Sequence, residues 1–308
     1  MNTNACQGCH IKDGRGKAKE AGEPNAISML VRLSIPASTA EQQARLIKEG
    51  TIGDPIYGGQ LQDMAIQGID SEGQVQISYD YHKETFKDGF EVELRKPTLT
   101  ISDLKYGPMH KDIMMSVRVA PTMIGLGLLE TISEADILAN ADPDDANNDG
   151  ISGKANYVWD VEKKQTTLGR FGWKAGQPNL MQQNASAFSG DLGLTSRLFL
   201  SDDCTDKQVA CKNAPHGGEL EVSDKILDFV EFYSQHLAVP ARRNMNSKKV
   251  MQGKQIFQQA NCQSCHVSQY TTAKGMNYPH CPSKQSRLIR IFFFMIWVLD
   301  SLIIGQSF

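Results

Sequence analysis

The chain has 308 residues, of which 40% are hydrophobic and 22% are charged, a composition typical of a globular protein of two modest domains. The formal net charge of −3, with Lys and Arg scattered along the chain, lacks the basic bias of nucleic-acid-binding proteins, so we expect no nucleic-acid partner. The most apolar stretch, residues 289–304, is short for a bilayer span and contains Asp300, so we expect no membrane span.

The N-terminus has neither the basic nor the apolar region of a signal peptide, and a C-x-x-C-H motif already occupies residues 6–10. A helical pattern follows at residues 41–49 and ends at Gly50. From residue 74 to 101, apolar and polar residues alternate on both sides of a turn at 87–89, which predicts a small β-hairpin.

An apolar run between residues 121 and 139 leads into a short helix, for which Ser133 is the expected cap. Gly, Pro and Asp residues then predict a loop at 142–153. Residues 224–236 have helical apolar spacing and stop before a proline. The pattern becomes polar at 243–248, where we place a domain boundary.

A second C-x-x-C-H motif occupies residues 262–266, directly after an apolar helical face formed by Val250, Gly253, Ile256 and Phe257. Such a face is typical of the first helix of a cytochrome c, which packs beside the haem edge, and equally of a helix within an apolar core. We keep both interpretations.

The C-x-x-C-H pattern is that of covalent haem attachment. Two thiols one helical turn apart form thioethers with the two vinyl groups, and the following histidine coordinates the iron as the proximal ligand. The predicted haem-binding residues are Cys6, Cys9, His10, Cys262, Cys265 and His266, with His10 and His266 as iron ligands. A zinc site built from the four cysteines is the alternative, but it leaves both histidines unexplained.

With these motifs in hand, the chain resembles the di-haem oxidoreductase family of bacterial peroxidase-like proteins, which are also labelled thiol oxidoreductases with two cytochrome c haem sites. The resemblance covers most of residues 4–278. Its matching blocks are residues 4–16, DPIYGGQLQ at 54–62, residues 120–130, DGISG at 149–153, GRFGWKA at 169–175 and LAVPARR at 237–243.

The resemblance also implies damaged ends. Family members begin with a leader and a further segment, so we expect this chain to be truncated before Cys6. Residues 295–307 can be back-translated into a nucleotide sequence with chosen codons. When that nucleotide sequence is translated in the frame that starts one base earlier, it gives His-Asp-Met-Gly-Pro-Gly, which is similar to the C-terminal motif of the family. We therefore expect a frameshift at about residues 279–284, and we attribute the apolar tail and Cys281 to it.

Two smaller sites are also predicted. Asp145, Asn147 and Asp149 precede Gly150 with the spacing of a calcium loop, and the resemblance to di-haem peroxidases favours calcium here. Asn156 stands where an EF-hand has Glu, so a plain polar turn is the alternative. Cys204 and Cys211 lie in a polar loop, where a disulfide is expected in an exported protein and two free thiols otherwise.

The ligands on the far side of each iron decide between electron transfer and peroxide binding. The candidates for these ligands are Met109, His110, Met114, Met115 and Met123. The alternative for each of these residues is that it lies in the core or on the surface and binds no iron. Glu130 is a further candidate, as an acid/base residue beside a peroxide-binding haem.

We expect a mainly α protein with a small β insertion and two cytochrome c-like domains. Residues 1–243 form the first domain, with a long inserted loop and β region, and residues 244–308 form an incomplete second domain with an aberrant tail from about residue 280. The expected function is haem binding and electron transfer by a di-haem c-type oxidoreductase, and the sequence leaves open whether peroxide is reduced. We expect a redox protein or small redox molecule as partner, and the periplasm as the location of intact relatives. The alternatives are an electron-carrier cytochrome and a gene fragment that never binds haem.

Overall fold

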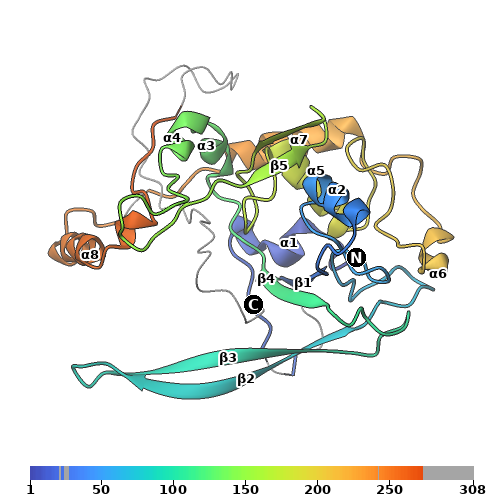
Figure 1. Ribbon diagram of the computed structural model, residues 1–308, viewed down its shortest axis with the longest axis horizontal. Coiled ribbons are helices and arrows are strands. Elements are labelled where there is room, and N and C mark those ends of the chain that lie inside the picture. Colours follow the sequence, from blue (N-terminus) through green and yellow to red (C-terminus); the bar gives the residue numbers. More distant parts are fainter. Residues whose placement is uncertain (21, 24–27, 242, 273–308) are drawn as a thin grey trace. The chain divides into compact units, whose positions relative to one another are not determined.

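The computed structural model describes residues 1–20, 22–23, 28–241 and 243–272, which divide into two units that interleave along the sequence (Figure 1). Unit 1 comprises Met1–Thr122 and Ala185–Leu227. Unit 2 comprises Met123–Asn184 and the described residues from Asp228 to 272.

The core of unit 1 is built on an antiparallel pair of strands, β1 (Met29–Ser34) and β4 (Met114–Val119). Met29 lies opposite Val119, and the side chains of β1 alternate between buried and more exposed positions. This period of two places Met29, Val31 and Leu33 on the buried face of the pair.

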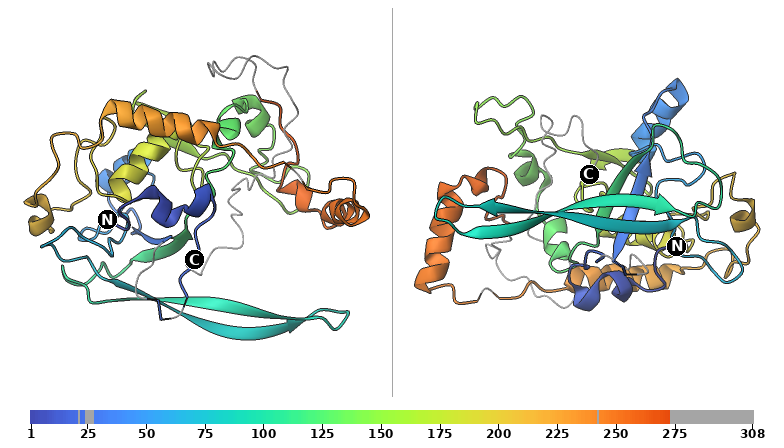
Figure 2. Two further views of the ribbon diagram at one scale, coloured as in Figure 1. Left: turned by 180° about the vertical axis from the view of Figure 1, so that it is seen from behind. Right: turned by 90° about the horizontal axis from the view of Figure 1, so that it is seen from below.

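The structure confirms a hairpin, rather than a meander, for the alternating pattern at residues 74–101. Strands β2 (Gln74–Thr85) and β3 (Glu91–Ser102) pair antiparallel along all twelve residues of each strand. Gly89 has a φ of 84°, a conformation that glycine adopts without strain, and it allows the tight turn. Figure 2 shows the hairpin as a long twisted ribbon that extends well beyond β1 and β4.

Only the end of the hairpin near β1 is buried. There Val75 and Ile77 join the buried face of β1, together with Tyr57 and Leu61 from the loop that follows α2 (Ala40–Glu49). The hydroxyl of Tyr57 donates to the carbonyl of Gly107 at 2.5 Å, so the core also fixes the chain that leaves β3.

Asp54 organises the loop between α2 and the hairpin. Its carboxylate is 2% exposed and accepts hydrogen bonds from the backbone N–H groups of Ile56 at 2.8 Å, Tyr57 at 3.0 Å and His110 at 2.8 Å. Because a buried N–H group is costly without an acceptor, Asp54 determines how this loop packs.

The helices of unit 1 are short. They comprise α1 (Cys6–Cys9), the 3₁₀ turn η1 (Ile11–Asp13), α2 and α6 (Val209–Lys212). The predicted helix ending at Gly50 is confirmed, with a capping box between Thr39 and Gln42 and a left-handed Gly50.

Two longer helices, α5 (Leu180–Gly190) and α7 (Asp224–His236), run from one unit into the other. The bounds of α7 agree with the prediction for residues 224–236.

Unit 2 contains four helical elements and one strand pair among its described residues. They are α3 (Leu126–Glu130), α4 (Glu134–Leu138), β5 (Tyr157–Asp160), β6 (Gln165–Leu168), α8 (Lys248–Gln259) and the 3₁₀ turn η2 (Cys262–Ser264). The predicted cap is confirmed, since the hydroxyl of Ser133 accepts from the N–H of Asp136 at 3.0 Å.

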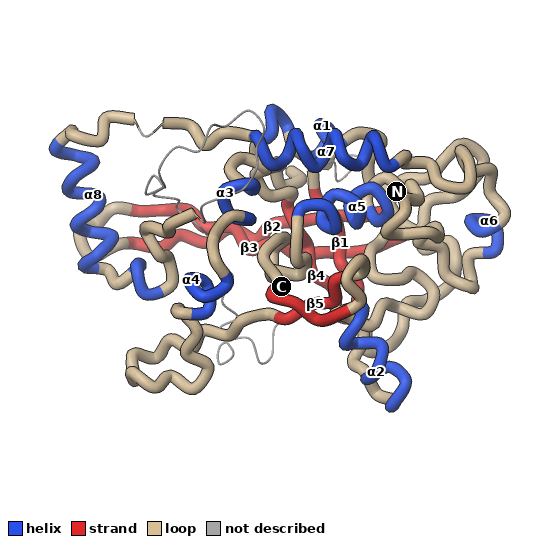
Figure 3. The backbone as a smooth tube through the Cα atoms, turned by 90° about the horizontal axis from the view of Figure 1, so that it is seen from above, coloured by secondary structure: helices blue, strands red, loops and turns tan. Residues whose placement is uncertain are grey.

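The predicted mainly α fold is wrong. Helix makes up 26% of the described residues and strand 21%, and the described strands form three antiparallel pairs rather than one small insertion (Figure 3). The error has a physical cause: β1 and β4 are six-residue segments whose partners lie some 85 positions apart, so no local turn marks them as strands.

The domain division at residues 243 and 244, and the cytochrome c-like character of each part, stay predictions. The tail from about residue 280, including Cys281 and the expected frameshift at 279–284, lies outside the described residues.

Substitution of Asp54 tests the role assigned to its carboxylate. Asp54→Ala leaves three N–H groups without their acceptor, so we expect the free energy of unfolding to fall by about 3 kcal/mol. Chemical denaturation of the variant measures this change. Asp80→Ala, the same substitution at an exposed position of β2, serves as the control and should change stability by less than about 0.5 kcal/mol.

Candidate haem-binding sites

The first C-x-x-C-H motif forms one turn of helix, α1. The backbone N–H of His10 donates to the carbonyl of Cys6 at 2.9 Å, and this bond closes the turn. Cys6 is exposed and Cys9 is half-buried, and both thiols are free. The turn therefore carries the two cysteines and the histidine in the order that haem attachment requires.

The segment just before the motif is anchored in the core of unit 1. The backbone N–H groups of Asn2 and Thr3 both donate to the carbonyl of Asp191, at 2.8 and 3.2 Å. The side chain of Asn2 donates to the carbonyl of Leu61 at 2.8 Å, and Gln60 donates to Asn2 at 2.6 Å. These buried bonds fix where the helical turn begins.

A close packing of backbone fixes the other side of the turn. The hydroxyl of Ser28 donates to the carbonyl of Gly8 at 3.1 Å. Gly16 lies so near that a Cβ atom there would be 2.7 Å from Cβ of Ser28 and 2.9 Å from the carbonyl oxygen of Cys9. Only glycine fits at position 16 without moving Cys9.

His10 is oriented by a backbone carbonyl. Its Nδ1 atom lies 2.8 Å from the carbonyl oxygen of Pro121, which can only accept, so Nδ1 is the donor. Nε2 is then the nitrogen whose lone pair is directed to a metal. Histidines that coordinate metals usually donate their second ring N–H in this way, because the bond fixes the tautomer and the orientation of the ring.

The two thiols of the first motif are poor nucleophiles by themselves. Desolvation by the surrounding protein raises the pKa of both Cys6 and Cys9 above the ordinary value for cysteine, so both are neutral thiols at pH 7. Redox-active C-x-x-C pairs have the opposite property, a lowered thiol pKa. The environment therefore fits structural attachment better than thiol–disulfide exchange.

The second motif closes in the same way within unit 2. The N–H of His266 donates to the carbonyl of Cys262 at 2.9 Å, the same bond and distance as in the first motif. Asn261, which precedes the turn, has a φ of 57°. The ring centroids of Phe257 in α8 and His266 lie 6.1 Å apart.

The apolar face predicted for α8 is present but not covered. Val250 is 44% exposed and Ile256 is 55% exposed, so α8 is not a core helix among the described residues. Ser247 caps the helix by accepting from the N–H of Val250 at 3.3 Å.

The predicted calcium loop folds on itself. The carboxylate of Asp145 accepts from the N–H groups of Asp149 at 3.0 Å and Gly150 at 3.1 Å, and the side-chain oxygen of Asn147 accepts from the N–H of Asp149 at 2.9 Å. Within the described part of the chain, no three His, Cys, Asp or Glu side chains are gathered closely enough to hold a metal ion. The calcium site stays a prediction.

The remaining predicted residues have clear positions. The disulfide between Cys204 and Cys211 is confirmed. Met109 and Met115 pack against the core of unit 1, and Met114 is 45% exposed.

Glu130 caps α5 in unit 2. One carboxylate oxygen accepts from the N–H of Leu180 at 2.9 Å, and the other accepts from the side chain of Gln235 at 3.0 Å. These bonds give Glu130 a structural role in joining α3, α5 and α7.

Sequence reasoning missed Pro121 and Gly16. Both lie in blocks that carry the family resemblance, but neither residue type by itself indicates contact with a haem motif. The contact requires the pairing of β1 with β4, which brings residue 120 beside residues 16 and 28: the N–H of Gly16 donates to the carbonyl of Ala120, and the N–H of Ala120 donates to the carbonyl of Ser28, both at 2.9 Å.

Comparison with known protein families identifies the family of the chain. Residues 1–292 match the family model described as "Di-haem oxidoreductase, putative peroxidase". The chain belongs to this family. No curated protein and no solved structure matches it. As a di-haem oxidoreductase the chain has haem as its implied cofactor, and both C-x-x-C-H turns fit that group.

None of the helices in the described part combines the length and apolar character needed to cross a membrane.

Gly16→Ala tests the packing behind the first motif. The added methyl group overlaps backbone atoms of Cys9 and Ser28, so we expect a loss of about 2 kcal/mol in the free energy of unfolding. Thermal or chemical denaturation measures the loss. Gly59→Ala is a matched control, because no atom lies within 4 Å of the added Cβ; equal losses in the two variants would contradict the assigned contact.

Proposed function

We propose that this chain is a c-type di-haem oxidoreductase. One haem is attached to Cys6 and Cys9 with His10 as its proximal ligand, and the other to Cys262 and Cys265 with His266 as its proximal ligand. The observation that carries the proposal is the hydrogen bond between His10 and the carbonyl of Pro121, which presents Nε2 on the same turn as two neutral thiols.

The protein residues have three tasks in this function. The cysteines hold the cofactor covalently, so that it stays bound in both oxidation states. The carbonyl of Pro121 increases the basicity of the His10 imidazole, which favours the oxidised metal. The backbone bonds to Asp191 keep the attachment turn in one conformation.

Bound haem supplies one-electron chemistry and, at an iron with an open coordination position, the reduction of peroxide. The chemistry requires an electron donor, and we propose a redox protein or small redox molecule in the periplasm, where c-type haem is attached. An electron carrier without peroxidase activity differs from this enzyme in having two closed, six-coordinate haems.

Counting covalent haem tests the attachment. The unaltered chain, exported behind a leader in a host that attaches c-type haem, should carry two haems by intact mass and by the pyridine haemochrome spectrum. Cys6→Ser with Cys9→Ser, and Cys262→Ser with Cys265→Ser, should each remove one haem. Cys281→Ser, outside both motifs, should remove none.

His10→Ala separates attachment from coordination. The variant should retain its covalent haem but show an altered visible and EPR spectrum. A wild-type chain without covalent haem would refute the proposal, and peroxide consumption that fails despite two attached haems would favour the electron carrier.

We also propose calcium binding by the loop that carries Asp145, Asn147 and Asp149. The left-handed Gly150, with a φ of 79°, and the bonds within the loop support an oxygen-lined turn. Calcium at ten to one hundred times its Kd should raise the free energy of unfolding by about 1.4 to 2.7 kcal/mol. Thermal unfolding with and without calcium checks this. Asp145→Asn should remove the gain and Asp144→Asn should retain it; a gain that survives Asp145→Asn would contradict the site.

A further inference from the structure

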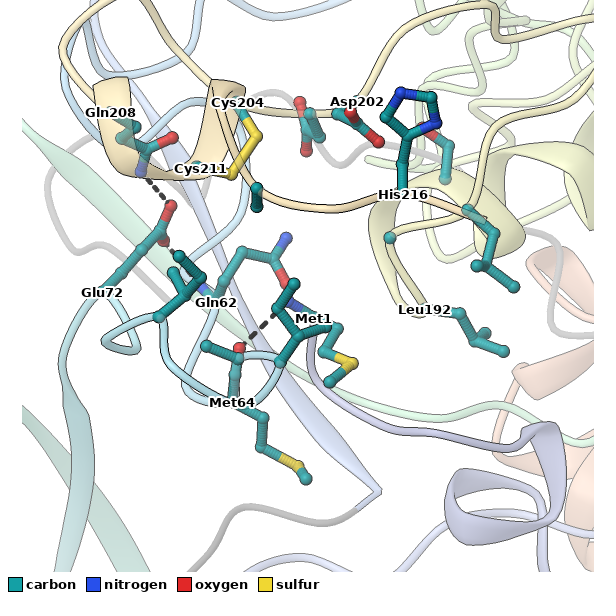
Figure 4. Close-up of a pocket in the computed structure, with 18 of the residues that line it drawn as sticks. Met1, Gln62, Met64, Glu72, Leu192, Asp202, Cys204, Gln208, Cys211 and His216 are labelled. Carbon is teal, nitrogen blue, oxygen red and sulfur yellow. Dashed lines mark hydrogen bonds between the residues drawn. A yellow bond between two sulfur atoms is a disulfide. The ribbon is translucent and has the colours of Figure 1, made fainter. Parts of the chain in front are cut away.

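A cavity of about 330 Å³ lies within unit 1, and neither Cys6 nor Cys9 lines it (Figure 4). Its walls are largely apolar and include Met64, Ile69, Tyr106, Leu192 and Leu194. Its volume is at the lower end of the range for small-molecule sites, and apolar walls with a few polar groups are typical of such sites.

The charged groups on the wall of this cavity are mostly acidic. Five carboxyl side chains line it, and none of the lining residues is Lys or Arg; the acidic residues are Asp70, Glu72, Asp202, Asp203 and Glu221. The basic groups are the imidazole of His216 and the amino group of Met1. Burial lowers the pKa of the Met1 amino group, which donates to the carbonyl of Met64 at 3.1 Å. The wall therefore attracts a positive charge.

Glu72 is the buried member of this group, with 5% exposure. One of its oxygens accepts from the backbone N–H of Gln62 at 2.6 Å, and the other accepts from the side chain of Gln208 (Figure 4). Both partners are neutral amides, so they orient the carboxylate without balancing its charge. Desolvation accordingly raises the pKa of Glu72 to about 7.

The wall that carries Gln208 is held in place before any ligand binds. The disulfide between Cys204 and Cys211 closes the loop around Gln208, and the hydroxyl of Thr205 donates to the carbonyl of Ile56 at 2.7 Å. Gln62 is held in place as well, because its side-chain amide donates to the carbonyl of Gly190 at 2.9 Å. A ligand therefore meets a preorganised site and loses little affinity to rearrangement of the wall.

We propose that this cavity binds a small organic cation with an apolar body, the ammonium group of which pairs with Glu72. The apolar walls enclose the body of the ligand, and its ammonium group pairs with a carboxylate that faces no Lys or Arg side chain on the cavity wall. No cysteine or histidine of either C-x-x-C-H motif lines the cavity, so the proposal does not rest on the proposed haem chemistry.

Three isosteric probes test the charge preference: 2-phenylethylammonium, neutral 2-phenylethanol and anionic 3-phenylpropionate. Isothermal titration calorimetry with the full chain at pH 8 should show the ammonium binding at least about tenfold more tightly than the alcohol. The carboxylate should not bind detectably. Equal affinities for the three probes, or no binding of the ammonium, would overturn the proposal.

Glu72→Gln tests whether the charge of Glu72 binds the ammonium group. The variant retains groups that can pair with Gln62 and Gln208 but lacks the charge, so the affinity for the ammonium should fall about tenfold and that for the alcohol should not change. Glu219→Gln, at an exposed position outside the cavity wall, is the matched control. An ammonium affinity that is equal in Glu72→Gln and the wild type contradicts the proposal.

The pH dependence of the wild type tests the same charge without a substitution. Because the pKa of Glu72 is about 7, the carboxyl is mostly ionised at pH 8 and mostly neutral at pH 6. The ammonium affinity should fall up to about tenfold between these values while the affinity for the alcohol stays constant. The Met1 amino group and His216 also line this cavity, and the pH dependence of Glu72→Gln separates their contribution from that of Glu72. A wild-type ammonium affinity that is constant from pH 6 to 8 contradicts the role of Glu72.

Discussion

The geometry of the first C-x-x-C-H motif depends on a buried amide contact that involves no residue of the motif itself. Gln60 donates to Asn2 at 2.6 Å and to Asp191 at 2.9 Å, and Asn2 donates in turn to the carbonyl of Leu61. Three segments separated by more than fifty residues are joined in this way. An attachment turn of four residues has too few internal bonds to hold its own position, so its position comes from this network.

The two motifs show how one local turn is used in two settings. In both, the histidine N–H closes on the first cysteine carbonyl at 2.9 Å, which follows from the spacing alone. The surroundings differ: the first turn has bonds to Ser28 and Pro121, whereas the second follows α8, whose apolar side chains are largely exposed. Short-range sequence thus sets the turn, and the rest of unit 1 or unit 2 sets its environment.

The features that sequence predicts well here are local. The hairpin, the helix ending at Gly50 and α7 each follow from periodicity together with a nearby turn or cap. The disulfide follows from two cysteines in one short loop. Strands β1 and β4 could not be predicted in this way, and neither could Pro121 as the partner of His10, because both depend on contacts between distant segments. The mainly α expectation failed for the same reason.

The hydrogen bond from His10 to Pro121 determines which substitutions would change the environment of His10. The accepting group is a backbone carbonyl, so it persists whatever side chain occupies position 121. What has to be preserved is the path of the chain just after β4, which Ala120 holds through its bonds to Gly16 and Ser28. Drift in the register of a two-stranded sheet would therefore alter the electronic character of His10, the proposed iron ligand, while leaving both C-x-x-C-H signatures intact, and the motifs alone would not reveal the change.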